Sequence, residues 1–166
     1  MHFIVLIIIP ENIYFQGINK IKQYISDIME KYDENFEVDP YIYKTKNILL
    51  REYKNSFEVN YDEYIKKNYD DVIFDENGNI LTRINKNAIF DYYVIHGRFG
   101  NVLVDNNKIS DFLEKYYLNK EEYTFKHIID KNGNLHINNN SNWSLIYENI
   151  LENAKNDYIL NLDCHI

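Results

Sequence analysis

The chain is poor in cysteine, proline and glycine: its 166 residues include one cysteine, two prolines and five glycines. Because Cys164 is the single thiol, neither an intramolecular disulfide nor a cysteine-based zinc site can form. A reducing compartment such as the cytosol is therefore expected. The sequence also lacks a linker or a low-complexity stretch, and its length fits one domain, so we expect a single domain over residues 1–166.

A basic stretch is missing as well. The chain has 18 lysines and arginines against 26 aspartates and glutamates, which gives a formal net charge of −8 at pH 7. That balance disfavours direct binding to nucleic acid or to an anionic membrane, since nucleic-acid binders usually show a basic stripe. An acidic surface suits a basic partner, such as the nucleic-acid channel of a host enzyme. Solubility alone explains the same charge and is the more ordinary explanation.

Long hydrophobic segments are also absent. The apolar run at residues 3–9 is too short to cross a membrane, and no basic segment precedes it as in a signal peptide. The apolar run ends at Pro10 and Glu11. The run is typical of a buried strand, so the sequence predicts a cytoplasmic protein without a membrane partner.

Along the sequence, segments with helical periodicity alternate with segments that carry hairpin signals. Apolar side chains recur at helical spacing over residues 18–32. Asn77-Gly78 and Asn132-Gly133 predict β-hairpins, because an Asn-Gly turn between β-rich runs is a strong hairpin signal. Asn60 and Ser110 are expected to cap helices. Further helices are expected at residues 47–54, 61–69, 110–117 and 143–154, hairpins at 72–83 and 125–137, and extended segments at 36–43, 90–95, 101–104 and 158–162.

Two apolar strands, residues 3–9 and 158–162, thus lie near the ends of the sequence, with helices and hairpins between them. This order predicts an α+β fold: a single domain with a mixed, mostly antiparallel sheet, β-hairpins and helices packed on the sheet.

Four stretches taken together, residues 2–7, 32–41, 75–99 and 163–166, resemble a family of small uncharacterised proteins of tailed phages and prophages. That family has an Asp-aromatic-aromatic-x-x-Gly-Gly-Arg-aromatic motif and a terminal Asp-Cys-His-Ile. In this chain His96 stands at the first glycine of the motif and Phe99 at a position where tryptophan is commoner. The resemblance implies an accessory role in the cytoplasm of a bacterial host, where many such genes counter host defence.

Residues 91–99 are the best candidate for a ligand site. Gly97 permits a close backbone approach because it has no Cβ, and Arg98 offers a forked donor for phosphate or carboxylate. Asp91 can orient that arginine. The other candidate ligand contacts are the rings of Tyr92, Tyr93 and Phe99, which can stack on a base or ribose, and the imidazole of His96. In the structural alternative, Arg98 pairs with Asp91 to hold a turn and the aromatic rings belong to the core.

Histidines allow a catalytic hypothesis. His96 and His165 have side chains suited to acid–base chemistry near neutral pH. Asp163 and His165 share one face if the last strand continues through them. They can bind a metal with His96 or Asp91, or form an acid–base pair with each other. The simpler alternative is that they hold the end of the chain in place. Cys164 then points the other way and is expected to be buried.

Three functions remain open at this point. The favoured one is a non-catalytic phage-type protein that binds and sequesters a nucleotide-derived host immune signal. The second is a phosphodiesterase or related hydrolase that uses His96 and His165. The third is an acidic, protein-binding inhibitor of a host defence enzyme or nuclease. We expect no cofactor and no metal, and homo-oligomerisation is left open.

Overall fold

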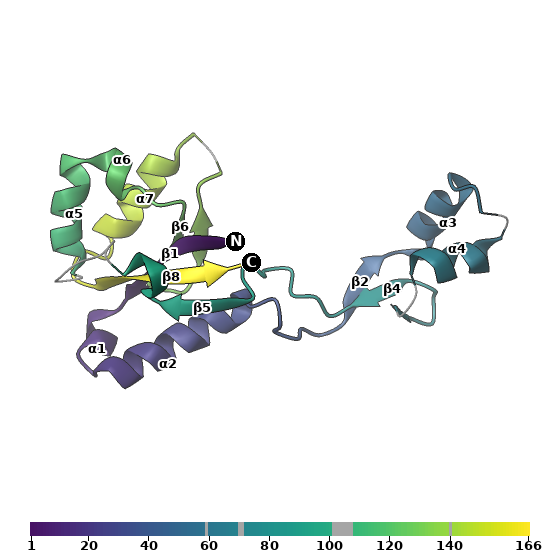
Figure 1. Ribbon diagram of the computed structural model, residues 1–166, viewed down its shortest axis with the longest axis horizontal. Helices are drawn as coiled ribbons and strands as arrows, with labels where there is room; N and C mark the ends of the chain where they lie inside the picture. Colours follow the sequence, from purple (N-terminus) through teal and green to yellow (C-terminus); the bar gives the residue numbers. More distant parts are fainter. Residues whose placement is uncertain (59, 70–71, 101–107, 140) are drawn as a thin grey trace. The chain divides into compact units, whose positions relative to one another are not determined.

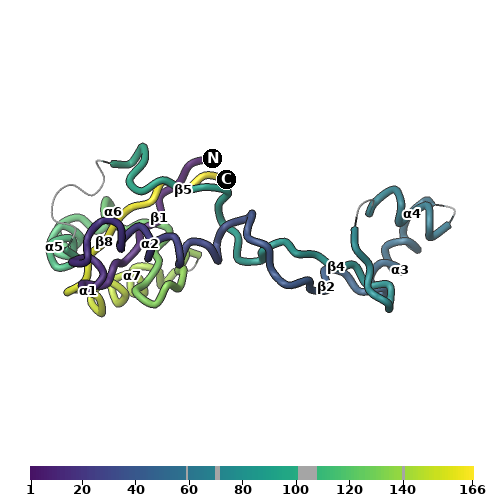
Figure 2. The backbone as a smooth tube through the Cα atoms, turned by 90° about the horizontal axis from the view of Figure 1, so that it is seen from below, coloured from purple at the N-terminus to yellow at the C-terminus, as the bar shows by residue number. Residues whose placement is uncertain are grey.

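The computed structural model describes residues 1–58, 60–69, 72–100, 108–139 and 141–166. The predicted α+β class is confirmed, because helices accompany two mostly antiparallel sheets. The chain divides into two compact units, one made of residues 1–34 with 87–166 and the other of residues 35–86 (Figures 1 and 2). The predicted single domain over residues 1–166 is not tested by this division and stays a prediction. The strand expected at residues 101–104 lies outside the described residues.

A sheet of five described strands forms the centre of the first unit, in the order β5-β8-β1-β6-β7 (Figure 1). Strand β1 pairs antiparallel with β8 over its whole length and parallel with β6, while the other pairs are antiparallel. The strands are β1 (His2–Ile9), β5 (Tyr92–Ile95), β6 (His127–Ile129), β7 (Leu135–Ile137) and β8 (Tyr158–His165).

Helices cover both faces of this sheet (Figure 1). Alternate residues of β1 point to opposite faces, so Val5 and Ile7 pack on the side of α2, while Leu6 and Ile8 pack on the side of α5 and α7. This burial on both faces explains why the first strand is continuously apolar. The helices on the first side are α1 (Glu11–Tyr14), α2 (Ile18–Met29) and the 3₁₀ turn η1 (Glu30–Tyr32), and those on the second are α5 (Ile109–Leu118), α6 (Lys120–Tyr123) and α7 (Trp143–Glu152).

The structure corrects two local expectations. Ser110 does not cap α5, because the helix begins one residue earlier with Lys108 at its N-cap, and the Ser110 hydroxyl donates to Asp111 instead. The last strand does not end at residue 162 but continues to His165. The second correction matters for function, since it places the residues of the terminal motif on a paired, central strand.

The second unit has a small sheet in the order β2-β4-β3, with two helices. The predicted hairpin is confirmed, and the Asn60 side chain caps α4 as expected, because its Oδ1 accepts the Glu63 N–H at 2.8 Å. Leu49, Tyr64 and Ile80 are buried in this unit. Its elements are β2 (Tyr41–Lys44), α3 (Lys46–Lys54), α4 (Tyr61–Asn68), β3 (Ile73–Phe74) and β4 (Ile80–Thr82).

Within the described ranges, no helix has both the length and the apolar character needed to cross a membrane.

The core of the first unit can be tested with Leu162→Ala. Leu162 is fully buried, and truncation of a buried leucine removes packing and leaves a cavity, so we expect the free energy of unfolding to fall by about 2–5 kcal/mol. Denaturant titration followed by the fluorescence of Trp143, the single tryptophan, measures this unit. The matched control is Leu145→Ala, whose side chain is 64% exposed and whose loss should change stability by less than about 0.5 kcal/mol. Equal effects of the two changes would contradict the described core.

Candidate functional site

One face of the sheet turns polar where β5, β8 and β1 lie side by side. Side chains of β8 alternate, so Asn161, Asp163 and His165 share a face, and Leu160, Leu162 and Cys164 occupy the other. His2 on β1 and Tyr92 on β5 are both paired with His165 in the ladder. The pairing register therefore brings two histidines and a tyrosine into one row across three strands.

Asp163 lies at the centre of this face and is only 5% exposed. Its Oδ1 accepts a hydrogen bond from His2 Nδ1 at 2.8 Å, and its Oδ2 accepts the backbone N–H of Arg98 at 3.0 Å. The Arg98 Nε lies 3.5 Å from the same Oδ2. Burial by itself would raise the pKa of Asp163, but these hydrogen bonds and nearby charges hold the pKa below its ordinary value of 3.8. Asp163 is therefore a buried anion that fixes both neighbours.

His2 connects Asp163 to the guanidinium of Arg98. The Nη2 atom of Arg98 lies 2.7 Å from His2 Nε2. Because a guanidinium can only donate, Nε2 of His2 must accept, and the ring proton is then on Nδ1, where it is donated to Asp163. The hydrogen bonds thus define His2 as a neutral imidazole with its Nε2 lone pair directed at Arg98.

His165 forms a second histidine–carboxylate pair beside the first. Its Nδ1 lies 3.0 and 3.1 Å from the two carboxylate oxygens of Asp91. Burial would raise the pKa of Asp91, yet His165 and backbone N–H groups lower it below 3.8. The Tyr92 ring stacks on His165 with centroids 4.8 Å apart, and His2 meets His165 edge-on at the same distance. We call His2, Asp91, Tyr92, Arg98, Asp163 and His165 the two-histidine cluster.

A tight turn brings Arg98 over Asp163. The chain leaves β5 through His96, at φ +62°, and Gly97, at φ +45°, into the 3₁₀ turn η2 (Gly97–Phe99). A Cβ on Gly97 would lie 2.4 Å from the Cβ of Asp163, so only glycine allows the backbone to pass there. The buried Asn161 side chain holds the turn, because it bonds His96 Nδ1 at 2.8 Å and donates to the Phe99 carbonyl at 2.8 Å.

The predicted site residues divide into two groups. Arg98, Asp91 and Tyr92 come together in the two-histidine cluster with His165, and Gly97 supports them. Tyr93 lies on the opposite face, in the α2 core, where its ring meets Phe90 edge-on at 5.5 Å. His96 is bound to Asn161, and Phe99 takes part through its backbone.

Two expectations about partners change. Arg98 does not pair with Asp91 but with Asp163, because η2 carries it across β8. His96 does not join His165, since the ladder places His2 there instead. Sequence reasoning missed His2 and Asn161 as members of this face. The alternation of polar residues at 161, 163 and 165 was the available signal, because it indicates one polar face on an otherwise apolar strand.

Cys164 lies on the core side of β8, as expected, and is fully buried. Burial raises the pKa of its thiol to about 12, so the group is a protonated core side chain at neutral pH. Among residues 1–58, 60–69, 72–100, 108–139 and 141–166, no three His, Cys, Asp or Glu side chains are grouped so that they could hold a metal ion.

A cavity of about 620 Å³ opens on the other side of this sheet edge. Its walls include Tyr14, Ile18, Ile95 and His96. His96 therefore also borders a mainly apolar space on the opposite side of the sheet from the cluster.

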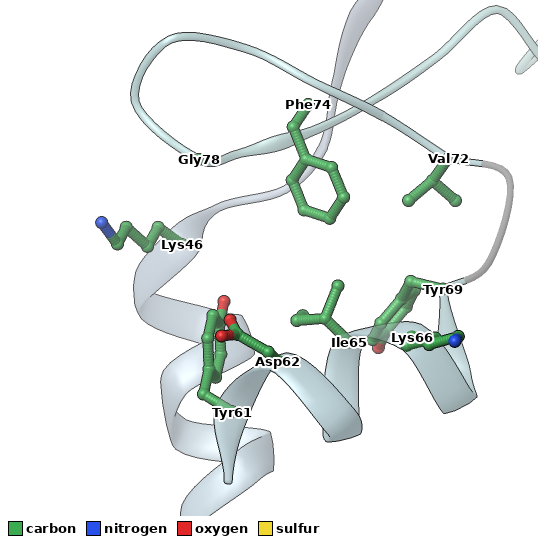
Figure 3. Close-up of a pocket in the computed structure, with 9 residues that line it drawn as sticks. All are labelled: Lys46, Tyr61, Asp62, Ile65, Lys66, Tyr69, Val72, Phe74 and Gly78. Atoms are coloured by element: carbon green, nitrogen blue, oxygen red, sulfur yellow. The ribbon is translucent and has the colours of Figure 1, made fainter.

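The second unit has a pocket of its own, of about 570 Å³. Figure 3 shows Phe74, from the β3–β4 hairpin, pointing toward Ile65 of α4, with Tyr69 at the end of that helix. Lys46 and Lys66 also line it. The Tyr69 hydroxyl donates to Glu52 at 2.7 Å and accepts from Lys44 Nζ at 2.7 Å. These polar groups satisfy one another, so they stabilise the unit, and none of them belongs to the residues that the motif singled out.

Gly97→Ala tests the close approach of η2 to Asp163. The added methyl group would overlap Asp163, and φ +45° disfavours any side chain, so we expect a loss of about 1–3 kcal/mol in unfolding free energy. Gly100→Ala is the matched control, because its nearest contact would be 3.6 Å away and its φ is negative. Trp143 fluorescence during denaturation compares them. If Gly97→Ala left the unfolding free energy unchanged, the turn would not lie over the Asp163 carboxylate.

Asp163 gives a pH prediction. Its pKa is lowered in the folded state, so its contribution to stability is complete above the ordinary value of 3.8 and is lost as pH falls through the lower, folded-state value. Asp163→Asn leaves a donor facing the Arg98 N–H, which should cost about 1–3 kcal/mol at pH 7. The variant should also lose stability less steeply than the wild type below pH 3.8. If the unfolding free energy of both proteins fell with the same slope below pH 3.8, this prediction would be wrong.

The side chains of the two-histidine cluster are the basis for inferring a function. No family model matches the chain significantly, and no curated protein and no solved structure does either.

Proposed function

We propose that the two-histidine cluster binds the phosphate group of a nucleotide-like small molecule. The observation that supports this best is the position of Arg98: its side chain is 57% exposed, and its Nη2 lies 2.7 Å from His2 Nε2. A guanidinium gives several donors to one anion, and arginine suits phosphate because of its planar fork. The backbone turn and Asp163 hold this donor in place before any ligand arrives.

Tyr92 supports a ligand with a ring. Its side chain is 47% exposed, and its ring already stacks on the imidazole of His165. An exposed aromatic face next to an anion site is suited to stack on a base. The negative net charge of the chain disfavours long nucleic acids, so a small nucleotide fits better than a DNA or RNA strand.

The biological role in this proposal comes from the sequence resemblance. A phage-type accessory protein in the host cytoplasm that binds a nucleotide-derived immune signal withdraws that signal from its receptor. This sequestration requires only binding at the two-histidine cluster. The partners are then the small molecule itself and, through it, the host defence system.

Arg98→Ala should abolish ligand-induced stabilisation. A ligand at about 100 times its Kd stabilises the folded state by about 2.7 kcal/mol, and removal of the guanidinium takes away the main anion donor. We expect a rise in melting temperature with at least one member of a panel of cyclic nucleotides and ADP-ribose derivatives for the wild type, and none for Arg98→Ala. Tyr92→Ala should weaken the response and Tyr92→Phe should retain it, because stacking needs only the ring.

Arg83→Ala is the matched control. Arg83 is also an exposed arginine, paired with Glu37 at 3.5 Å in the second unit, so its removal should leave the ligand response unchanged. A panel without any response would contradict the proposal. If no nucleotide of the panel raised the melting temperature and the protein captured a host protein in a salt-sensitive complex, the acidic-inhibitor hypothesis would be favoured instead.

A further inference from the structure

The two histidines of the cluster share an arrangement that binding alone does not require. In each ring Nδ1 is held by a carboxylate, of Asp163 for His2 and of Asp91 for His165. A carboxylate on Nδ1 fixes the orientation and the tautomer of an imidazole and leaves Nε2 for proton transfer. Both rings are partly exposed, with 20% of the His2 side chain and 30% of the His165 side chain accessible.

The two rings have matching hydrogen-bond partners. His2 must present a lone pair on Nε2, because Arg98 Nη2 donates to it. A neutral imidazole with that lone pair is a general base. His165 is held in the same way: its Nδ1 lies 3.0 and 3.1 Å from the oxygens of Asp91, and its Nε2 lies 3.4 Å from the Met1 nitrogen, which donates. When such a ring takes up a proton on Nε2, it can act as a general acid.

The centroids of the two rings are 4.8 Å apart, and Arg98 is next to the first. At this separation both rings can reach oxygens attached to one phosphorus, which is the condition for concerted acid and base action. Arg98 is placed to neutralise charge on the non-bridging oxygens as the phosphorus becomes five-coordinate.

From these observations, and resting on the proposed phosphate site, we propose that the cluster hydrolyses a phosphodiester bond of its nucleotide ligand. His2 Nε2 removes a proton from water as the water oxygen bonds to phosphorus. The bond from phosphorus to the leaving oxygen breaks, and His165, after taking up a proton from solvent, donates it from Nε2 to that oxygen. The products are a phosphomonoester and an alcohol, and later exchange of one proton with solvent restores both imidazoles. No oxidation or reduction occurs.

The experiment uses the full chain and bis(p-nitrophenyl) phosphate, a chromogenic phosphodiester. We expect release of p-nitrophenol by the wild type, and a loss of 100-fold or more in kcat for His2→Asn and for His165→Asn, because general acid–base catalysis contributes about 10²–10⁴-fold. Asparagine can still donate to the carboxylate that holds Nδ1 and lacks the Nε2 function, so KM should change little. Trp143 fluorescence checks that each variant is folded.

The matched control is His136→Asn. His136 also pairs with a carboxylate, with its Nε2 3.0 Å from Asp130 Oδ2, but it lies on the other edge strand, β7. Its replacement should leave the rate unchanged. An equal loss in this variant would attribute the effect to general stability and overturn the assignment.

The outcomes separate the two proposals. If Arg98-dependent nucleotide binding is found and neither bis(p-nitrophenyl) phosphate nor the bound nucleotide is turned over, hydrolysis is refuted and sequestration stands. If p-nitrophenyl phosphate, a monoester, is cleaved and the diester is not, the diester assignment is wrong. If hydrolysis occurs without any change on Arg98→Ala, the phosphate site itself is misplaced and both proposals fail.

Discussion

The buried carboxylate of Asp163 is the constraint on which the polar face of the sheet depends. A buried anion costs several kcal/mol unless donors compensate it, and here His2 and the backbone of Arg98 supply them. These two donors are brought together only because β1 pairs with β8 and because Gly97 lets the turn pass over the carboxylate. The same hydrogen bonds that stabilise the fold therefore also set the position of the imidazole and the guanidinium.

Binding and hydrolysis would use this face in related ways. Arg98 is held from one side by Asp163 and donates on the other to His2, so an incoming phosphate meets a donor whose position is already fixed. Preorganised charge of this kind favours both tight binding and stabilisation of a transition state. What would distinguish a catalyst from a sequestering protein is the second pair, His165 with Asp91, because an anion site by itself does not need a second oriented imidazole.

Local patterns in the sequence predicted much of the fold and part of the site. The helical periodicity of apolar residues predicted α2, and the Asn-Gly turns predicted both hairpins. Helices α1 and α6 were not predicted, because they have four residues each and are too short to show a period. Arg98, Asp91 and Tyr92 were predicted together, but the neighbouring Tyr93 was not separable from Tyr92 until the direction of β5 was known. His2 could not be placed, since no local signal encodes the register between strands that are so distant in the sequence.

The pairing of β1 with β8 has a consequence for biosynthesis. His2 and Asp163 are separated by 161 positions, so the first strand emerges from the ribosome long before its antiparallel neighbour exists. Strand β1 cannot pair with β8 until β8 has been synthesised. Such non-local pairing is slow compared with the closure of hairpins. The second unit, built from the continuous segment 35–86, has no such delay. The polar face can therefore form only after β8 has been translated.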